Sequence, residues 1–567
     1  MLTLTEPQST FITRASPESV LIACPGSGKT HTAVLRFIER CKVERDFGVA
    51  FLSYTNVAVN EANTKAAEHG AGGLIGHPHA ISTIDSFFRT FVFDAFIRTL
   101  LPNVPSEVEI IESRPVALGT DKAYSIYGIR PKARGKAFDA PLEAWEIECF
   151  LQADRSLAYD YRKSSYSQDR VTVPADYNRL IARSKARYLE RGFATYNDIL
   201  LFCYFLLRQK SLRVAEIVAK RFAEIIVDEA QDTSTLQQEM LQMVAAAGAK
   251  ISYVGDPSQG IYLFNKANPS YLTDLETTGH ERHELLTNFR SVYEIVAVVN
   301  SHFGKSMRAK RSKTHPCHGA YLFVGQERDA ISSFEKMVSR AEIAFSDAAV
   351  LVRKRSDLGK ALQPYDVKGW RSAPRFAIDA WQRERRGEFQ EASQAALRLL
   401  KAVAHPDGLA VLETTRIKEL AWLFLRGPAF PTPSGRETPQ QWCGRLKTAL
   451  ESYLTVNGIA KHDGFGARTA PNGMRNVGSA LEEFSFDRPT LRTTVIHQAK
   501  GETISGVLVV APPAQHDKWL ADVPDQEESN ICYVAFTRAA DLLVLQCPDE
   551  TYAARWRERG FKDFITL

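Results

Sequence analysis

Short apolar runs alternate with amphipathic segments over the first part of the chain. The run 19–22 precedes a segment, 32–40, whose apolar residues recur with the period of a helix. The run 49–54 has the character of a buried strand, 56–68 begins with asparagine and continues as a helix, and 81–87 is a short strand running into a turn. Alternating strands and helices favour a parallel sheet with helices on both faces. We expect this architecture for the start of the chain.

The alternation is interrupted twice and returns each time. Further strands are expected at 224–229, 250–256, 348–353, 493–496, 507–510 and 542–545, with a helix at 292–302. We therefore predict an α/β protein with two parallel-sheet cores, each interrupted by a mostly helical insertion. The first core comprises 1–88 and 192–284 around the insertion 89–191, and the second comprises 285–366 and 491–567 around the insertion 367–490.

The first insertion is rich in basic side chains interleaved with tyrosines. This mixture suits a surface that follows a nucleic acid strand, but it also suits a solvated helical face, and the sequence leaves both readings open. The basic residues are Arg130, Lys132, Arg134, Lys136, Arg162, Lys163, Arg179, Arg183, Lys185, Arg187 and Arg191, and the tyrosines are Tyr159, Tyr161, Tyr166, Tyr177 and Tyr188.

Composition and apolar run length indicate in which cellular compartment the protein is expected. The 567 residues carry a net charge of +5, with 24% charged and 44% hydrophobic residues, which is ordinary for a globular protein and permits a nucleic-acid partner without requiring one. The 8 cysteines include no Cys-x-x-Cys pair, the longest apolar run, 199–207, is too short to span a bilayer, and the N-terminus has no signal pattern. We expect a soluble, cytoplasmic protein with reduced thiols and no membrane partner.

A phosphate-binding loop is the strongest chemical signal in the sequence. The run Ala23-Cys24-Pro25-Gly26-Ser27-Gly28-Lys29-Thr30 joins the first predicted strand to the first predicted helix. In such a cradle the backbone of the turn and the helix N-terminus face an anion, the lysine reaches the outer phosphates, and the hydroxyl after it holds a magnesium ion. Lys29 and Thr30 are therefore candidate ligands of a nucleotide and its metal. Ala23 stands where the full consensus has glycine.

A second motif supplies the carboxylates that such a loop requires. Asp228 and Glu229 follow the apolar residues of the strand predicted at 224–229. Asp228 is expected to coordinate magnesium, directly or through water, and Glu229 to polarise the water that attacks the phosphate.

The run Asp228-Glu229-Ala230-Gln231-Asp232 resembles the second motif of superfamily 1A helicases, the UvrD/Rep/PcrA type, and further motifs follow in the family's order. The resemblance implies two RecA-like cores, ATP and Mg²⁺ as cofactors, and movement 3′ to 5′ on single-stranded or tailed DNA. In the nucleotide site, it implies adenine contacts by Gln8 and Phe289, a γ-phosphate contact by Gln259, a ribose contact by Glu502, and arginines that stabilise transition-state charge at Arg290 and Arg538.

The same resemblance implies DNA contacts in both cores. These residues are Tyr54, Thr55, Asn56, Tyr262, Phe264 and His497. Several positions depart from the family pattern. Phe264 replaces a base-stacking tryptophan, Asp85 stands where the family has histidine, and Asn265 where it usually has arginine. His31 lies where relatives often have arginine, and Glu502 comes one place earlier than usual.

A narrower resemblance concerns the compact build and the run Lys500-Gly501-Glu502-Thr503, which are similar to the helicase-like component of Gabija antiphage defence systems. That resemblance implies a partner nuclease with an ATPase domain and a TOPRIM domain. The chain ends at Leu567, shortly after Arg538, so we expect no nuclease domain of its own. An alternative from a different class is a DNA-end-sensing (d)NTPase that regulates a partner nuclease with little or no unwinding.

Overall fold

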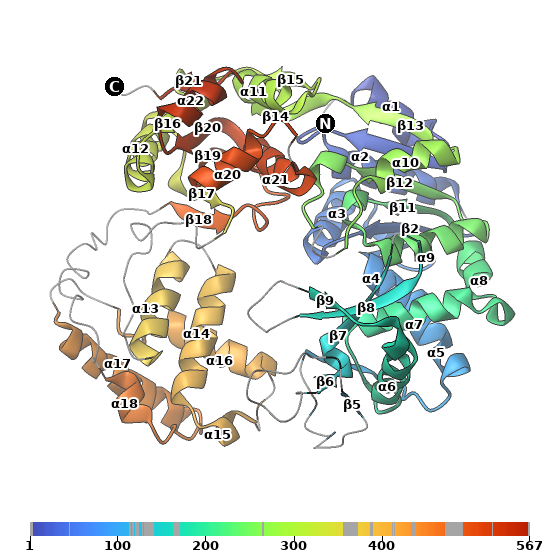
Figure 1. The fold of residues 1–567 in the computed structure, drawn as a ribbon, viewed down its shortest axis with the longest axis horizontal. Coiled ribbons are helices and arrows are strands. Elements are labelled where there is room, and N and C mark those ends of the chain that lie inside the picture. Colours follow the sequence, from blue (N-terminus) through green and yellow to red (C-terminus); the bar gives the residue numbers. More distant parts are fainter. Residues whose placement is uncertain are drawn as a thin grey trace. The chain divides into compact units, whose positions relative to one another are not determined.

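The computed structural model describes residues 4–564 except 45, 113–114, 116–117, 119–123, 128, 130–140, 153, 163–169, 263–265, 355–371, 386–388, 411, 413, 433–436, 471–490 and 524. The chain divides into two compact units, Met1–Phe289 and Arg290–Leu567, whose elements are drawn in Figure 1. Each unit is built on one six-stranded sheet, which confirms the predicted α/β class.

The sheet of the first unit places the ends of its central strands side by side. Its strand order is β13 (Glu281–Leu285), β1 (Ser19–Ala23), β12 (Ile251–Gly255), β11 (Phe222–Val227), β2 (Gly48–Ser53) and β3 (Ala80–Thr83). All neighbouring strands are parallel. The carboxyl ends of β1, β11 and β12 therefore meet at one edge, where ligands bind in sheets of this kind.

Helices cover both faces of this sheet, as the alternating pattern predicted. Side chains from α1 (Glu6–Thr13), α2 (Lys29–Val43) and α3 (Asn56–Glu68) pack with Leu21, Phe51 and Ile226. The opposite face carries α4 (Ile84–Phe88), α5 (Asp94–Leu100), α7 (Tyr196–Arg208), α8 (Val214–Arg221) and α9 (Thr235–Ala246), which pack with Val20, Leu52 and Val227. Strand residues alternate between the two clusters because successive side chains of a strand point to opposite faces.

One local prediction for the first unit was wrong, and one was incomplete. The strand expected over 81–87 ends at Thr83, because the Thr83 hydroxyl accepts a hydrogen bond from the Ser86 backbone and starts the helix α4. The first insertion also contains a three-stranded antiparallel sheet that the expectation of a mostly helical segment did not include. Its strands are β7 (Ile147–Leu151), β8 (Leu157–Arg162) and β9 (Arg170–Thr172).

The rest of this region combines short strands with one long helix. The short elements are β4 (Glu109–Ile110), β5 (Ser125–Ile126), β6 (Leu142–Glu143) and β10 (Phe193–Ala194). The helix α6 (Asn178–Glu190) exposes Arg179, Arg183 and Arg187 but buries Lys185. Lys185 Nζ donates to the carbonyl oxygens of Ala144 and Ile147 and forms an ion pair with Asp198. Lys185 is thus part of the core and does not belong to the basic surface in which we had counted it.

The second unit repeats the parallel arrangement. Its strand order is β18 (Arg492–Val495), β17 (Ala348–Val352), β19 (Ile504–Val510), β20 (Ala539–Cys547), β16 (Gly319–Val324) and β21 (Lys562–Asp563), and all neighbours are parallel. Its helices are α11 (Tyr293–Phe303), α12 (Glu327–Arg340), α20 (Pro513–Trp519), α21 (Gln526–Thr537) and α22 (Glu550–Arg557). The strands β14 (Thr287–Val292) and β15 (Arg308–Arg311) pair separately from the main sheet.

The described part of 367–490 is helical and has its own core. The helices are α13 (Ser372–Arg385), α14 (Phe389–Val403), α15 (Pro406–Ala410), α16 (Thr414–Arg426), α17 (Pro439–Val456) and α18 (Phe465–Thr469). The buried Trp442 lies at its centre together with Leu399, Leu446 and Phe424. Within the described residues, no helix combines the length and the apolar character needed to cross a membrane.

Candidate functional site

The loop between β1 and α2 has the backbone of a phosphate cradle. β1 ends at Ala23 and α2 begins at Lys29. Gly26 and Gly28 have φ values of +68° and +78°, a left-handed conformation that glycine adopts without steric cost. A Cβ atom on Gly28 would also lie only 3.1 Å from Gln8 Nε2. A glycine-rich turn that leads directly into a helix N-terminus is suited to bind an anion.

Two carboxylates reach this loop from the end of β11. Lys29 Nζ lies 2.7 Å from Glu229 Oε2. The Thr30 hydroxyl donates a hydrogen bond to Asp228 Oδ2 over 2.9 Å. The structure thus brings together the two motifs that the sequence pattern assigned to one site, although they lie far apart along the chain.

Burial governs the electrostatics of this group. Asp228 is fully buried, which raises the pKa of its carboxyl group to about 6, and the Glu229 carboxylate adds to the shift. Burial lowers the pKa of the Lys29 ammonium, but the attraction of Glu229 and Asp228 outweighs it, so the net pKa lies above the ordinary value. Lys29 therefore remains a cation at neutral pH, as a phosphate ligand must.

Asp228 and Thr30 also fit magnesium. Asp228 Oδ2 accepts the Thr30 hydroxyl, whereas Oδ1 is buried and has no hydrogen-bond partner among the described residues. Magnesium prefers oxygen ligands and is usually held by one or two carboxylates together with substrate phosphates. The part of the chain that the structure describes contains no group of three or more His, Cys, Asp or Glu side chains able to hold a metal. The Thr30 hydroxyl and the Asp228 carboxylate are oxygen donors of the kind that magnesium prefers.

Gln8 lies directly against the loop. Its Nε2 donates to the Ser27 carbonyl oxygen over 3.1 Å and to the Thr32 hydroxyl over 3.3 Å. Its Oε1 accepts from the Thr5 backbone N–H over 2.9 Å, which closes a capping box at the start of α1. Gln8 is therefore fixed against the loop, with both ends of its amide hydrogen-bonded.

The segment after β12 approaches the same carboxylates. Gln259 is buried, and its Nε2 donates to Asp256 Oδ2 over 2.7 Å. The Asp256 backbone N–H donates to Gln231 Oε1 over 3.1 Å, and Gln231 Nε2 donates to Glu229 Oε2 over 2.5 Å. Gln259 is thus connected to Glu229 through two intervening residues.

Asn288 and Phe289 lie in the first unit and touch the cradle. The Phe289 backbone N–H donates to the Gly26 carbonyl oxygen over 2.9 Å, and Asn288 Nδ2 donates to the Pro25 carbonyl oxygen over 2.7 Å. These bonds hold the Phe289 backbone beside the glycine-rich turn.

In the second unit, the two predicted arginines meet at Thr537. Arg290 Nη1 donates to the Thr537 carbonyl oxygen over 3.0 Å, and Arg538 Nη2 donates to the Thr537 hydroxyl over 3.3 Å. Arg538 is almost fully buried and also donates to the Glu502 carbonyl oxygen over 3.2 Å. The Glu502 carboxylate forms a two-bond ion pair with Arg492, each N···O distance being 2.8 Å. A ribose contact by Glu502 would compete with this pair.

Of the residues predicted to contact DNA, Tyr54 and Tyr262 lie side by side in the first unit. The Tyr54 and Tyr262 rings lie 5.4 Å apart with their planes tilted by 31°. Thr55 caps the N-terminus of α3 and Asn56 begins this helix, whereas His497 is half-buried in the turn after β18 in the second unit. Phe264 and Asn265 lie outside the described residues.

Asp85, which replaces the family's histidine, has a protein partner. Its carboxylate accepts a hydrogen bond from Gln237 Nε2 over 2.5 Å. Burial raises the pKa of the Asp85 carboxyl group, and the Gln237 bond offsets part of that shift. This position therefore connects α4 to α9.

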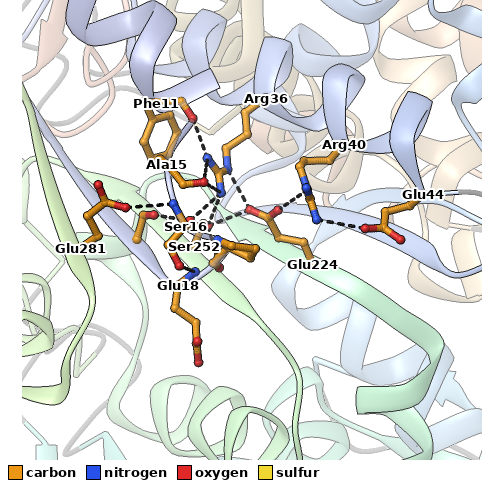
Figure 2. A network of polar contacts seen from close by, with 12 residues as sticks. Phe11, Ala15, Ser16, Glu18, Arg36, Arg40, Glu44, Glu224, Ser252 and Glu281 are labelled. Carbon is orange, nitrogen blue, oxygen red and sulfur yellow. Dashed lines mark hydrogen bonds and ion pairs between the residues drawn. The ribbon is translucent and has the colours of Figure 1, made fainter. Parts of the chain in front are cut away.

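A buried network fixes α2 to the sheet, as Figure 2 shows. Arg36 on α2 and Glu224 on β11 are almost fully buried, and Arg36 Nε donates to Glu224 Oε1 over 2.8 Å. Arg40 reaches the other oxygen of Glu224 over 2.8 Å, and the Ser252 hydroxyl on β12 donates to Glu224 over 2.7 Å. The remaining donors of Arg36 bind carbonyl oxygens of the segment 11–16.

This network connects the two elements that lead to the motifs. Lys29 precedes Arg36 on α2 by about two helical turns, and Asp228 comes directly after β11, the strand that carries Glu224. Neither Arg36 nor Glu224 was predicted from the sequence. The available signal was an arginine within the apolar stripe of the helix predicted at 32–40, and a glutamate at the start of an apolar strand.

Gln231 was also given no role from sequence, although it lies inside the second motif. Its side chain is fully buried between Glu229 and Asp256. A buried polar side chain is normally hydrogen-bonded, but the sequence could not show which groups it joins. Asn288 was missed in the same way, because its contact with Pro25 depends on how β14 passes the loop.

Comparison with known proteins agrees with this geometry. Residues 4–279 match the family model of the UvrD/REP helicase N-terminal domain. YjcD of Bacillus subtilis, named as a putative ATP-dependent DNA helicase, is 26% identical over 462 residues, which is 68% of this chain and 60% of that protein. An ATP-dependent helicase/nuclease protein of Carboxydothermus hydrogenoformans is 31% identical over 186 residues, which is 32% of this chain and 15% of that protein.

The aligned regions thus cover less than two thirds of either relative. The family model matches the residues that carry the cradle, the Asp228-Glu229 pair and the Gln259 turn. Residues 4–279 therefore carry a likeness to the UvrD/REP helicase N-terminal domain, and the named helicases support a resemblance of the chain to UvrD-like helicases.

Proposed function

We propose that this chain is an ATP-dependent DNA helicase or translocase that hydrolyses ATP with Mg²⁺ and moves 3′ to 5′ on single-stranded DNA. The observation that carries the proposal is the double contact between the loop and β11, Lys29 to Glu229 and Thr30 to Asp228. A phosphate ligand, a metal-binding hydroxyl, a metal-binding carboxylate and a candidate general base are joined by these contacts in one unit.

In the proposed reaction, each side chain has a defined task. The loop from Pro25 to Gly28 holds the phosphates, and the Lys29 ammonium neutralises their charge. Thr30 and Asp228 would hold Mg²⁺, which supplies charge neutralisation at the phosphate oxygens when bound. Glu229 accepts a hydrogen bond from the attacking water and orients it.

Other residues would act on the nucleotide and the developing charge. Gln8 and Phe289 would bind adenine, Gln259 would contact the γ-phosphate, and Glu502 would reach the ribose. Arg290 and Arg538, in the second unit, would stabilise the charge of the transferring phosphoryl group. Both arginines donate hydrogen bonds to Thr537, and these bonds support the proposed role because a displacement of Thr537 would move both guanidinium groups together.

Single-stranded or tailed DNA is the proposed substrate. The Tyr54 and Tyr262 ring pair supports it, because aromatic rings can stack with bases of any sequence. Thr55, Asn56, Phe264 and His497 would complete this path. Tyr262 follows closely on the turn that holds Gln259, which offers a covalent connection between DNA binding and the nucleotide site.

A nuclease with ATPase and TOPRIM domains, in an antiphage defence complex, is the proposed partner. This part rests on the resemblance carried by the run Lys500-Gly501-Glu502-Thr503. The relatives named as helicase/nuclease proteins support a connection to nucleases in general. The second candidate, a DNA-end-sensing (d)NTPase that regulates such a nuclease with little unwinding, is favoured by Asp85, whose carboxylate binds Gln237 where a family member would offer histidine to DNA.

One set of measurements tests the proposal. ATP hydrolysis should require Mg²⁺ and should be stimulated by single-stranded and tailed DNA, and a strand-displacement assay on the same sample should release the displaced strand. Lys29→Ala should lose both nucleotide affinity and turnover, whereas Glu229→Ala should bind ATP and stall. Stimulated hydrolysis without displacement would support the second candidate, and turnover in Glu229→Ala would refute the site.

A further inference from the structure

Gln231 is a buried residue beside the candidate base, and the proposed reaction assigns it no role. It lies in the short turn Ala230–Asp232 after Glu229, and its side chain is fully buried. Both ends of its amide are engaged. Nε2 donates to Glu229 Oε2 over 2.5 Å, and Oε1 accepts from the Asp256 backbone N–H over 3.1 Å. One planar group therefore joins the candidate base to the end of β12.

The connection continues in both directions. On one side, Glu229 Oε2 also lies 2.7 Å from Lys29 Nζ. On the other side, Asp256 Oδ2 accepts from Gln259 Nε2 over 2.7 Å. The five residues form an uninterrupted polar chain from the phosphate-binding lysine to the candidate γ-phosphate sensor, and all of them belong to the first unit.

The space around Gln231 is shaped for this contact. A Cβ atom on Gly255 would lie 2.5 Å from Gln231 Oε1 and 2.6 Å from Leu272 Cδ1. Such distances are far below van der Waals contact, so only glycine at the end of β12 lets the amide reach the Asp256 backbone. Glycine at 255 and glutamine at 231 therefore depend on each other.

Glu229 needs an anchor of this kind. Its backbone has φ of +53°, a left-handed conformation that is unfavourable for a residue with a Cβ atom. Its carboxylate receives hydrogen bonds from Lys29 and from Gln231 on the same oxygen. Phosphate oxygens compete with Glu229 for the Lys29 ammonium, whereas the Gln231 amide has no part in phosphate binding. The Gln231 amide can therefore keep donating to Glu229 while the Lys29 ammonium engages phosphate oxygens.

We propose that Gln231 is a positioning residue, which orients the Glu229 carboxylate toward the attacking water and transmits to it the position of the turn 256–259. The inference rests on the proposed ATP hydrolysis and adds a residue to it. Because Gln231 acts through Glu229 and does not touch the cradle, its loss should slow hydrolysis without weakening nucleotide binding.

The test compares Gln231→Met with a matched control, Gln238→Met. Gln238 is also buried, but its amide donates to the backbone carbonyl and hydroxyl of Thr233 and to the Asn268 carbonyl, away from Glu229. The measurements are kcat and KM for ATP, the Kd of a non-hydrolysable ATP analogue, and the thermal midpoint of each variant. Gln231→Met should lower kcat by about 10- to 100-fold, as expected for one lost hydrogen bond to a charged group, with KM and Kd within about twofold.

Gln231→Glu provides a second variant of the same size. It keeps the acceptor for the Asp256 N–H but places a carboxylate oxygen against Glu229, so it should lower kcat at least as much. The inference is overturned if either folded variant retains kcat within about threefold of wild type while Glu229→Ala is inactive. A loss of kcat in Gln238→Met equal to that in Gln231→Met would also overturn it, since the effect would then be structural. Turnover in Glu229→Ala would refute the proposed site itself and this inference with it.

Discussion

Arg36→Met tests whether the network beneath the cradle holds the first unit together. The substitution keeps most of the side-chain volume but removes the charge, which leaves the fully buried Glu224 with Arg40 and Ser252 as its remaining partners. Breaking a buried ion pair from one side costs about 3–5 kcal/mol. Because Arg40 still compensates part of the charge, we expect a loss of about 3 kcal/mol in the free energy of unfolding of this unit.

The magnitude converts into a measurable shift in thermal stability. At about 2–4 °C per kcal/mol for a large domain, the midpoint of the first unit should fall by roughly 6–12 °C. Denaturant unfolding monitored by tryptophan fluorescence and circular dichroism gives the free energy independently. Arg40→Met is the matched control, because the Arg40 side chain is 25% exposed and pairs also with Glu44. It should cost about 1 kcal/mol or less.

A double variant distinguishes the loss of the Arg36–Glu224 attraction from the cost of leaving the Glu224 carboxylate unpaired in the core. Arg36→Met combined with Glu224→Leu removes both partners, so no unpaired carboxylate remains in the core. Such replacements are often neutral or stabilising relative to the broken pair, so the double variant should be at least as stable as Arg36→Met alone. If Arg36→Met stays within about 1 kcal/mol of wild type, or if the double variant is less stable, the network does not stabilise the unit in the way proposed.

Three further outcomes are expected. Arg290→Ala should fold and bind ATP but lose most turnover, and a hydrolysis rate within about threefold of wild type would contradict its role. Tyr262→Ala should weaken single-stranded DNA binding by about 1–3 kcal/mol while basal hydrolysis persists, and unchanged affinity in a salt titration would remove the ring pair from the DNA path. Burial lowers the pKa of His516 from 6.5 to about 4, so the unfolded chain binds its proton first as the pH falls below 6.5. Lowering the pH from about 7 to about 5 should cost the second unit about 2 kcal/mol through this histidine, and His516→Gln should remove that part of the pH dependence.

The sheets could be predicted from sequence because their strands are buried on both faces. The run at 49–54 and the run at 507–510 are continuous and apolar, and the structure has strands there. β13 escaped prediction because its sequence, Glu281-Arg282-His283-Glu284-Leu285, is highly charged. It is an edge strand paired on one side with β1, and an edge strand can remain polar. A run of apolar residues indicates a strand that is buried, so a strand that is only partly buried, such as β13, gives no such signal.

The site was predictable only as far as its motifs are local in sequence. The cradle is local, since strand, turn, lysine and helix follow one another, and its residues lie in the expected elements. The contact of Phe289 with Gly26 is not local, because it depends on β13 and β14 passing the loop. Lys185 was misplaced for the opposite reason. Its charge suggested a surface, but Asp198 and two carbonyl oxygens compensate that charge inside the core.

Two buried carboxylates of the first unit, Glu224 and Asp228, have different surroundings. Beneath the sheet edge, Glu224 forms ion pairs with Arg36 and Arg40 and accepts a hydrogen bond from the Ser252 hydroxyl, so two arginines balance its buried charge. At the edge itself, Asp228 is buried with one oxygen that has no hydrogen-bond partner among the described residues, and its pKa rises from 3.8 to about 6. Since folding raises this pKa, keeping Asp228 ionised at neutral pH is unfavourable for the folded state. A bound cation would offset that cost, whereas a protonated Asp228 would lose its value as a metal ligand. The proposed Mg²⁺ would therefore bind at a buried carboxylate oxygen to which no described residue donates a hydrogen bond.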